Sequence, residues 1–211
     1  MALFFPVYLF DVDGTLTDSA PDITSSVLET LDRNGYPAQP VSLLRSYIGK
    51  HLTELFTDII PGIDQAGIDD LILQYRAIYT AKGHSGTRAY EGVVETLAAL
   101  PGRKGTATTK GSAMTRVVLE QFGMLPYFEH VQGTDGFPAK PAPDVIHRGL
   151  EAMGAKGSDV LFVGDSTADV VAGRAAGVTV CAVRWGYGDH AEMEAHAPDF
   201  WIDHPSQLLS L

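Results

Sequence analysis

The chain has 211 residues, a length that suits one α/β domain carrying an insertion better than two large independent domains. Hydrophobic residues make up 45% of the chain and charged residues 19%, so a sizeable core can form and global disorder is excluded. The formal net charge is −11 and the sequence has no Lys/Arg cluster, which argues against a nucleic-acid-binding protein.

The sequence gives no sign of a membrane span, because its apolar runs are shorter than the roughly 18 residues that a spanning helix needs. Residues 1–10 are apolar but lack basic residues and stop at Asp11, so we expect a buried strand there rather than a signal peptide. The single cysteine, Cys181, cannot form an internal disulfide, and we therefore expect a reducing, cytoplasmic setting.

The first part of the chain is expected to contain one strand and then helices only. The strand is predicted at 3–10, and helical spacing follows without any strand from about residue 18 to 83. Helices in this stretch are predicted at 19–34, around 43–44, at 52–60 and at 68–79. We expect residues 18–83 to form a helical cap domain inserted after the first strand, with glycine hinges at Gly14 and at Gly83–Gly86.

Helices and strands alternate in the rest of the chain. Helices are predicted at 93–100, 112–122, 143–153, 168–176 and at the C-terminal end, and strands at 105–108, 130–132 (weak), 160–163, 178–183 and 200–202. Such alternation predicts an α/β fold, a Rossmann-like parallel sheet with helices on both faces. We expect this sheet domain to comprise residues 1–17 and 84–211.

A first group of polar residues follows the first strand directly, in the order Asp11-Val-Asp13-Gly14-Thr15. Parallel sheets bind their ligands at the carboxyl ends of strands, and in a strand continuing through Val12 the two aspartates would project to the same side. Gly14 could bend the chain so that backbone N–H groups point at an anion. The alternative is an ordinary Asp-Gly turn at a strand end.

A second acidic group, Asp165 and Asp169, lies just after the strand predicted at 160–163. The two residues are four apart and could face one cavity if the turn leads into a helix. Asp165 or Ser166 could instead simply cap that helix. Acidic residues at two strand ends of one parallel sheet predict a divalent-metal site, because carboxylate oxygens suit Mg²⁺.

Donors for an anion come from two further segments. Thr108 and Thr109 end the strand predicted at 105–108, and Lys140 lies in a proline-rich loop before a helix. A hydroxyl group and helix N-terminal N–H groups can hold a phosphate, and a lysine can neutralise a transferring phosphoryl group. Considered alone, Thr108 is also a typical strand residue and Lys140 a typical solvated loop lysine.

The order of these motifs, Asp-x-Asp-Gly-Thr, Thr, Lys-Pro and Gly-Asp-Ser-x-x-Asp, resembles the haloacid dehalogenase superfamily of phosphatases over essentially the whole chain. Residues 11–22 and 90–93 are similar to the phosphoglycolate phosphatase branch, whose members carry a helical cap. The resemblance implies that Asp11 is the nucleophile and that Asp13 protonates the leaving group and later activates water. It further implies Mg²⁺ held by the Asp11 carboxylate, the Asp13 backbone carbonyl and Asp165, with Thr108 and Lys140 holding the phosphoryl oxygens.

The resemblance also implies that Asp169 orients Lys140 or a metal-bound water. Relatives usually carry Asn where this chain has Thr109, which keeps a backbone donor and a hydroxyl group but lacks the amide; Lys110 follows as expected. In the cap, the segment 49–51 is a candidate specificity loop, with Lys50 available for a substrate carboxylate or second phosphate. Lys50 could equally be an exposed residue at a helix start.

These observations together predict a Mg²⁺-dependent phosphatase that acts on small phosphate monoesters, with 2-phosphoglycolate as a candidate substrate. The alternatives within the superfamily are a phosphosugar phosphatase or mutase and a phosphonate hydrolase; a true dehalogenase needs neither Asp13 nor a metal. From another class, a phospho-accepting receiver-like signalling module combines similar residues but lacks the helical insertion. We expect a small phosphorylated metabolite as the partner, no nucleic acid or membrane, and a monomer or homodimer.

Overall fold

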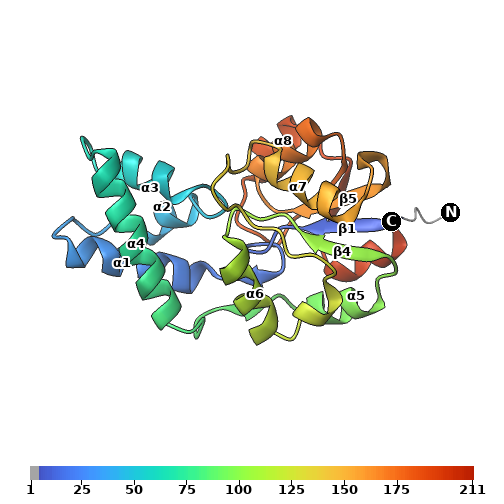
Figure 1. Cartoon of the computed structure of the whole chain (residues 1–211), viewed down its shortest axis with the longest axis horizontal. Coiled ribbons are helices and arrows are strands. Elements are labelled where there is room, and N and C mark those ends of the chain that lie inside the picture. The colour runs from blue at the N-terminus through green and yellow to red at the C-terminus, as the bar shows by residue number, and fades with distance from the viewer. Residues whose placement is uncertain (1–4) are drawn as a thin grey trace.

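A parallel sheet forms the centre of the structure, a computed structural model that describes residues 5–211 (Figure 1). Its strands are β1 (Val7–Phe10), β4 (Arg103–Thr106), β5 (Val160–Gly164), β6 (Thr179–Val183) and β7 (Phe200–Ile202). They lie in the order β4-β1-β5-β6-β7, and all neighbouring pairs are parallel. The chain moves from β1 to one side and then returns to the other, so the order reverses at the carboxyl end of β1, where such sheets bind ligands.

Helices cover both faces of the sheet, as the alternating sequence pattern predicts. On one face Tyr8 and Phe10 of β1 pack with residues of α5 (Val93–Ala99), α6 (Ser112–Gln121) and the 3₁₀ helix η3 (Pro205–Ser210). On the other face Val7 and Leu9 pack with residues of α7 (Asp144–Met153) and α8 (Thr167–Ala176). Strands buried on both faces are apolar at every position rather than at alternate positions, which is why β1 reads as the continuous run VYLF. The shorter helices are η1 (Leu125–Tyr127), η2 (Gly157–Asp159) and α9 (His190–Ala195).

Four helices form a separate lobe beside the carboxyl ends of the strands (Figure 1). They are α1 (Ala20–Arg33), α2 (Val41–Arg45), α3 (Leu52–Ile59) and α4 (Gln65–Ala81). Their apolar faces meet in a hydrophobic cluster of their own, which includes the fully buried Leu31, Leu44 and Phe56. The stretch predicted to be helical therefore holds no strand between β2 (Thr17–Asp18) and β3 (Arg88–Ala89).

The entry and exit of this lobe are tied together. β2 and β3 pair in antiparallel fashion, Thr17 with Ala89 and Asp18 with Arg88. The buried Asp22 carboxylate of α1 accepts hydrogen bonds from Gly86 N (3.1 and 3.0 Å) and from Thr87 Oγ1 (2.6 Å). The glycine segment predicted as a hinge is thus bonded to the first turn of α1.

Some predicted elements differ from the observed ones. The first strand begins at Val7 and ends at Phe10, so it does not continue through Val12; residues 3 and 4 of the prediction lie outside the described residues. The strand predicted at 105–108 ends at Thr106, and the one predicted at 130–132 is reduced to isolated bridges. There Thr106 Oγ1 donates to Gln132 O and accepts from Gln132 N, so that a side chain replaces part of the backbone ladder. The predicted C-terminal helix is the 3₁₀ helix η3. No helix within residues 5–211 is long and apolar enough to cross a membrane.

Candidate active site

The predicted site residues come from separate segments that end at one edge of the sheet. Asp11 follows β1, and its backbone N–H donates to Val163 O of β5 (2.9 Å), which fixes it beside the end of that strand. Asp165 follows β5, Asp169 lies in the first turn of α8, and Lys140 precedes α7. The sheet therefore brings together residues that are up to 158 positions apart in the sequence, from Asp11 to Asp169.

Lys140 is the buried cation at this edge. Its Nζ lies 2.9 Å from Asp11 Oδ1 and 2.5 Å from Asp169 Oδ1, and all three side chains are at most 3% exposed. Burial alone would lower the pKa of Lys140, but the negative charges of Asp11 and Asp169 outweigh it and raise this pKa. The prediction that Asp169 orients Lys140 agrees with this geometry, and a solvated loop lysine is the wrong description of Lys140.

Three buried carboxylates, those of Asp11, Asp165 and Asp169, offer oxygen atoms within 4.8 Å of one another. Burial, followed by the charges of Asp169 and Asp11, raises the pKa of Asp165 well above its usual value. Burial likewise raises the pKa of Asp11 to about 6, although Lys140 opposes the shift. Asp11 Oδ1, despite its ion pair with Lys140, receives no hydrogen bond from any residue in the range 5–211. Buried carboxylates that repel one another, one of them with an oxygen that accepts no hydrogen bond, fit a hard divalent cation such as Mg²⁺.

Asp165 is held rigidly by its surroundings. Its Oδ1 accepts from Thr15 Oγ1 and its Oδ2 from Tyr187 N, both at 2.9 Å. Gly14 and Gly186 approach so closely that a Cβ on either would lie 2.2 Å from an atom of Asp165. The loop after β6 supports Asp165 through Tyr187, and its Trp185 donates to Thr15 O (3.1 Å).

Gly14 bends the chain between Asp13 and Thr15, as the sequence predicts. Its φ of +89° lies in the region that favours glycine, but its backbone N–H donates to Thr17 O (2.8 Å) rather than pointing free toward an anion. The N–H of Gly14 itself is thus engaged in a turn hydrogen bond, and the expectation that the bend directs backbone N–H groups at an anion stays a prediction. Glycine is required here because the backbone passes against Asp165.

Asp13 does not belong to the group of three close carboxylates, and it lines the cavity described below. Ser19 Oγ donates to its Oδ1 (2.6 Å), and Lys110 Nζ lies 3.2 Å from its Oδ2. Lys110 Nζ also donates to Tyr79 OH of α4 (3.1 Å). Burial alone would lower the pKa of Lys110, but the negative charge of Asp13 outweighs this effect, and the pKa is raised. The Asp13 side chain is therefore fixed from both the lobe and the sheet.

Asp169 serves two purposes at once. Its Oδ1 pairs with Lys140, and its Oδ2 accepts from Ser166 N (2.9 Å) and Ser166 Oγ (2.6 Å), which forms a capping box at the start of α8. The alternative that Ser166 caps this helix is confirmed, and the cap leaves one carboxylate oxygen of Asp169 for Lys140, so that the positioning role of Asp169 stays a prediction.

The remaining predicted residues have different surroundings. Thr108 is buried next to the cavity, and its Oγ1 accepts from Lys110 N (3.4 Å). Thr109 Oγ1 donates to Gly49 O of the lobe (2.9 Å). Lys50 also lines the cavity, but its exposed ammonium pairs with Glu54 (2.8 Å), which agrees with the alternative of a surface residue at a helix start.

Several residues around the site were not assigned from the sequence: Thr15, Ser19, Lys110 and Tyr187. Thr15 and Lys110 lie next to predicted residues in the sequence. A carboxylate such as that of Asp13 is stabilised by a positive partner, and this requirement could have identified Lys110. Nothing local in the sequence links Ser19 to Asp13 or the amide of Tyr187 to Asp165, because both contacts depend on how the chain turns back.

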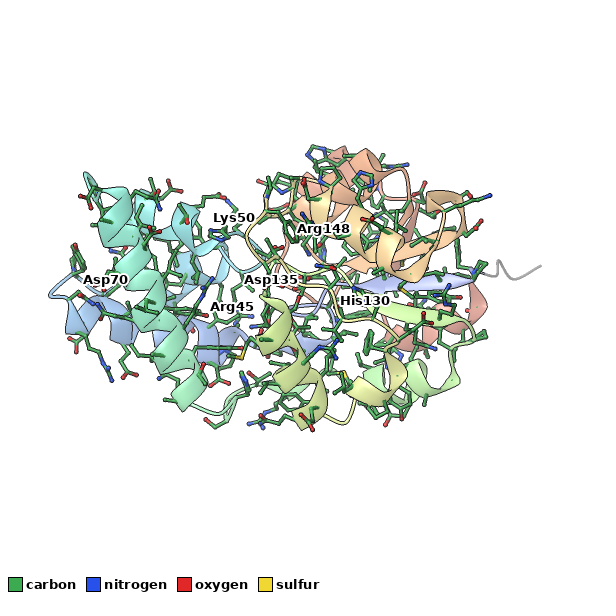
Figure 2. All side chains as sticks on the ribbon, viewed as in Figure 1. Arg45, Lys50, Asp70, His130, Asp135 and Arg148 are labelled. Atoms are coloured by element: carbon green, nitrogen blue, oxygen red, sulfur yellow. The ribbon has the colours of Figure 1, made fainter. Side chains whose placement is uncertain are left out.

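A cavity of about 540 Å³ lies between the lobe and the sheet edge. Asp11, Asp13 and Thr108 line its base, whereas Lys140 and Asp165 are not among its lining residues. Figure 2 shows Lys50 and Asp135, two further lining residues, in the region where the lobe meets the sheet domain, and Asp70 at the distant end of the lobe. A substrate in this cavity would be enclosed by helices of the lobe and would reach the two aspartates.

Comparisons with known proteins agree with this arrangement. Residues 8–183 match the family model described as haloacid dehalogenase-like hydrolase. The chain is 33% identical to the phosphoglycolate phosphatase of Vibrio parahaemolyticus, over 96% of this chain and 93% of that protein, and 34% identical to pyrophosphatase PpaX of Bacillus cereus, over 96% and 94%. The crystal structure of a predicted phosphatase from Clostridium acetobutylicum superposes with a TM-score of 0.90 at 27% identity and covers 99% of this chain and 100% of that one. The chain therefore belongs to the haloacid dehalogenase-like hydrolases and is a phosphoglycolate phosphatase-like enzyme within them.

Proposed function

We propose that this enzyme hydrolyses small phosphate monoesters in a Mg²⁺-dependent reaction that passes through a phosphorylated Asp11. The observation that carries the proposal is the buried arrangement of Lys140, Asp165 and Asp169 around Asp11, which lines a cavity together with Asp13. The relatives named as phosphatases support the same reaction class.

Asp11 is the proposed nucleophile. Its carboxylate attacks phosphorus, the ester P–O bond breaks, and an aspartyl-phosphate forms. A pKa of about 6 leaves Asp11 ionised above neutral pH, as a nucleophile requires. The ion pair with Lys140 orients the carboxylate and offsets the negative charge of an incoming phosphoryl group, while the buried Thr108 hydroxyl lies beside the same space.

Asp13 is the proposed general acid and base. It donates a proton to the oxygen of the departing alcohol and then takes a proton from the water that attacks the aspartyl-phosphate and releases inorganic phosphate. Its contacts with Ser19 and Lys110 keep the carboxyl group at the cavity floor through both steps.

Asp11, Asp165 and the backbone carbonyl of Asp13 are the groups that we propose to hold Mg²⁺. When bound, the ion would offset the negative charge of the carboxylates and of the substrate phosphate. Orienting the substrate does not by itself neutralise this charge. Asp169 is engaged by Ser166 and Lys140, so it remains a positioning residue in this proposal.

The helical lobe is the proposed cap. We assign residues 18–83 to the cap and residues 1–17 and 84–211 to the catalytic core, on the basis of the separate hydrophobic cluster of the four helices and the paired segments at its base. The names of the relatives make 2-phosphoglycolate and pyrophosphate candidate substrates for comparison. A reducing, cytoplasmic setting is proposed from the buried free thiol of Cys181.

The test of the nucleophile compares the protein with its Asp11→Asn variant on an aryl phosphate. We expect turnover to fall below detection while circular dichroism shows an unchanged fold, because the amide cannot form the acyl phosphate. Retained turnover would refute the assignment. Rapid phosphorylation of Asp11 with negligible release of inorganic phosphate would instead identify a receiver-like phospho-acceptor.

The test of the metal is separate. EDTA should abolish turnover, and Mg²⁺ should restore it, whereas Ca²⁺, which prefers more ligands at longer distances, should not. Full activity after exhaustive chelation would contradict the metal assignment and leave the nucleophile assignment standing.

A further inference from the structure

The cavity above Asp11 and Asp13 is larger and more apolar than a two-carbon leaving group requires. Side chains from every helix of the lobe and from α6 line it, among them Val27, Leu44, Leu55, Tyr75, Tyr79 and Met114. An engineered apolar cavity of about 150 Å³ is large enough to bind benzene. The volume of about 540 Å³ therefore has room for a ring-sized group in addition to a phosphate.

The charged side chains of the cavity are mostly engaged within the chain. Lys110 contacts Asp13 and Tyr79, Lys50 pairs with Glu54, and the Asp135 carboxylate accepts from Ser112 N (3.2 and 3.3 Å). Arg76 of α4 forms no ion pair within residues 5–211, but it is exposed, and an anion bound to an exposed arginine stays largely hydrated. The wall thus favours recognition by apolar contact over recognition of a second anionic group.

We propose that the preferred substrates are phosphate monoesters whose leaving alcohol carries an apolar body of about the size of a ring, which packs against the aromatic and aliphatic wall formed by α1, α3 and α4. This inference rests on the proposed phosphatase function and deepens it. Tyr75 and Tyr79, which both line the cavity, stack on each other at a centroid separation of 5.7 Å, and Lys110 Nζ lies over the Tyr79 ring, 4.5 Å from its centroid. An apolar body displaces water from this wall, whereas a small acid leaves it wet.

The experiment compares three monoesters of primary alcohols: ethyl phosphate, 2-phosphoglycolate and 3-phenylpropyl phosphate. Ethyl and 3-phenylpropyl phosphate have leaving alcohols of similar chemistry, so their ratio of kcat/KM reports recognition rather than leaving-group reactivity. One methylene in an apolar pocket changes kcat/KM by about tenfold or more, so we expect the phenylpropyl ester to exceed ethyl phosphate by at least that factor. The kcat/KM of the phenylpropyl ester should also exceed that of 2-phosphoglycolate.

A matched pair of variants locates the selectivity. Leu52→Trp adds volume at a half-buried position of the cavity wall, and Leu73→Trp makes the same change on the outer surface of α4, where Leu73 is 68% exposed and does not line the cavity. We expect Leu52→Trp to lower the ratio of phenylpropyl to ethyl kcat/KM at least tenfold and Leu73→Trp to leave the ratio unchanged. Met114→Trp, on the opposite wall, repeats the test if Leu52→Trp does not fold.

Binding gives a second measurement that does not need turnover. 4-Phenylbutylphosphonate should bind the wild-type protein at least tenfold more tightly than propylphosphonate, with the more negative heat-capacity change that burial of apolar surface produces. A kcat/KM for ethyl phosphate or 2-phosphoglycolate that equals or exceeds that of the phenylpropyl ester would overturn the inference and leave the phosphatase function intact. If the protein hydrolysed none of the three esters, the proposed phosphatase function would instead be refuted.

Discussion

The sheet edge and the helical lobe hold their functional surfaces in different ways. At the edge, each carboxylate is fixed by polar contacts from separate segments: Asp165 by Thr15 and Tyr187, Asp169 by Ser166 and Lys140. The lobe presents a wall of apolar side chains that is shaped by helix packing. The difference separates two tasks. In the proposed function, the polar edge performs the reaction common to all substrates, and the apolar wall distinguishes one leaving group from another.

The largest effect is expected where the polar edge loses its buried cation. Lys140→Met leaves Asp11 and Asp169 without a counter-charge, so kcat should fall about a thousandfold for every monoester alike. Breaking a buried ion pair should also cost about 3–5 kcal/mol of the free energy of unfolding, measured by urea titration. Lys156→Met, at an exposed position, is the control and should change neither quantity. If the variant lost activity toward bulky substrates only, the claim that the sheet edge acts on all substrates alike would be contradicted.

The next largest effect on kcat is expected where the backbone of Gly14 passes close to Asp165. Gly14→Ala places a Cβ 2.2 Å from Asp165 Oδ2 and must displace that carboxylate, so we expect kcat to fall about a hundredfold. Gly35→Ala is a matched control, because Gly35 also has a positive φ (+71°) but its Cβ would meet nothing within 4 Å. Both variants should lose about 1–3 kcal/mol of stability from backbone strain, and only Gly14→Ala should lose activity. Equal activities of the two variants would show that the position of Asp165 does not matter.

The contact between the two regions offers a smaller and sharper test. Thr109 Oγ1 donates to Gly49 O of the lobe (2.9 Å). Thr109→Val keeps the shape and removes a hydrogen bond worth about 1 kcal/mol, so kcat/KM should fall about fivefold. The factor should be the same for small and bulky esters, since the apolar wall is untouched, and Thr109→Ser should retain wild-type kinetics. A changed substrate ratio would mean that this contact shapes the wall.

The sequence predicts the polar edge better than the lobe for a physical reason. Asp11, Asp165 and Lys140 lie at the ends of strands or before a helix, and a parallel sheet necessarily brings such ends to one edge. Their partners cannot be predicted in this way: the amide of Tyr187 and the hydroxyl of Ser19 reach the aspartates only because loops turn back onto them. The donation of Gly14 N–H to Thr17 O is a turn hydrogen bond that motif order alone does not specify.

The lobe shows the same limit more strongly. Helical spacing predicts α1, α3 and α4 to within a few residues, because each helix buries one apolar stripe. The volume of the cavity depends on how four such stripes fit together, and small changes in packing would fill or enlarge it. The selectivity that we propose for the cavity is therefore a property of the folded lobe rather than of any motif in it.

The smallest effect is expected in the interior of the sheet, where the native fold should keep reagents away from buried side chains. Cys181 lies on β6, is fully buried, and has a pKa that burial raises to about 12. Because the thiolate is the reactive form, iodoacetamide at pH 8 should leave the native protein unmodified and its activity unchanged, as followed by mass spectrometry. In urea the same reagent should add one label, since the chain has a single cysteine. Rapid labelling of the folded protein would show that the sheet opens as readily as a surface element, and the fixed geometry of the sheet edge would then be refuted.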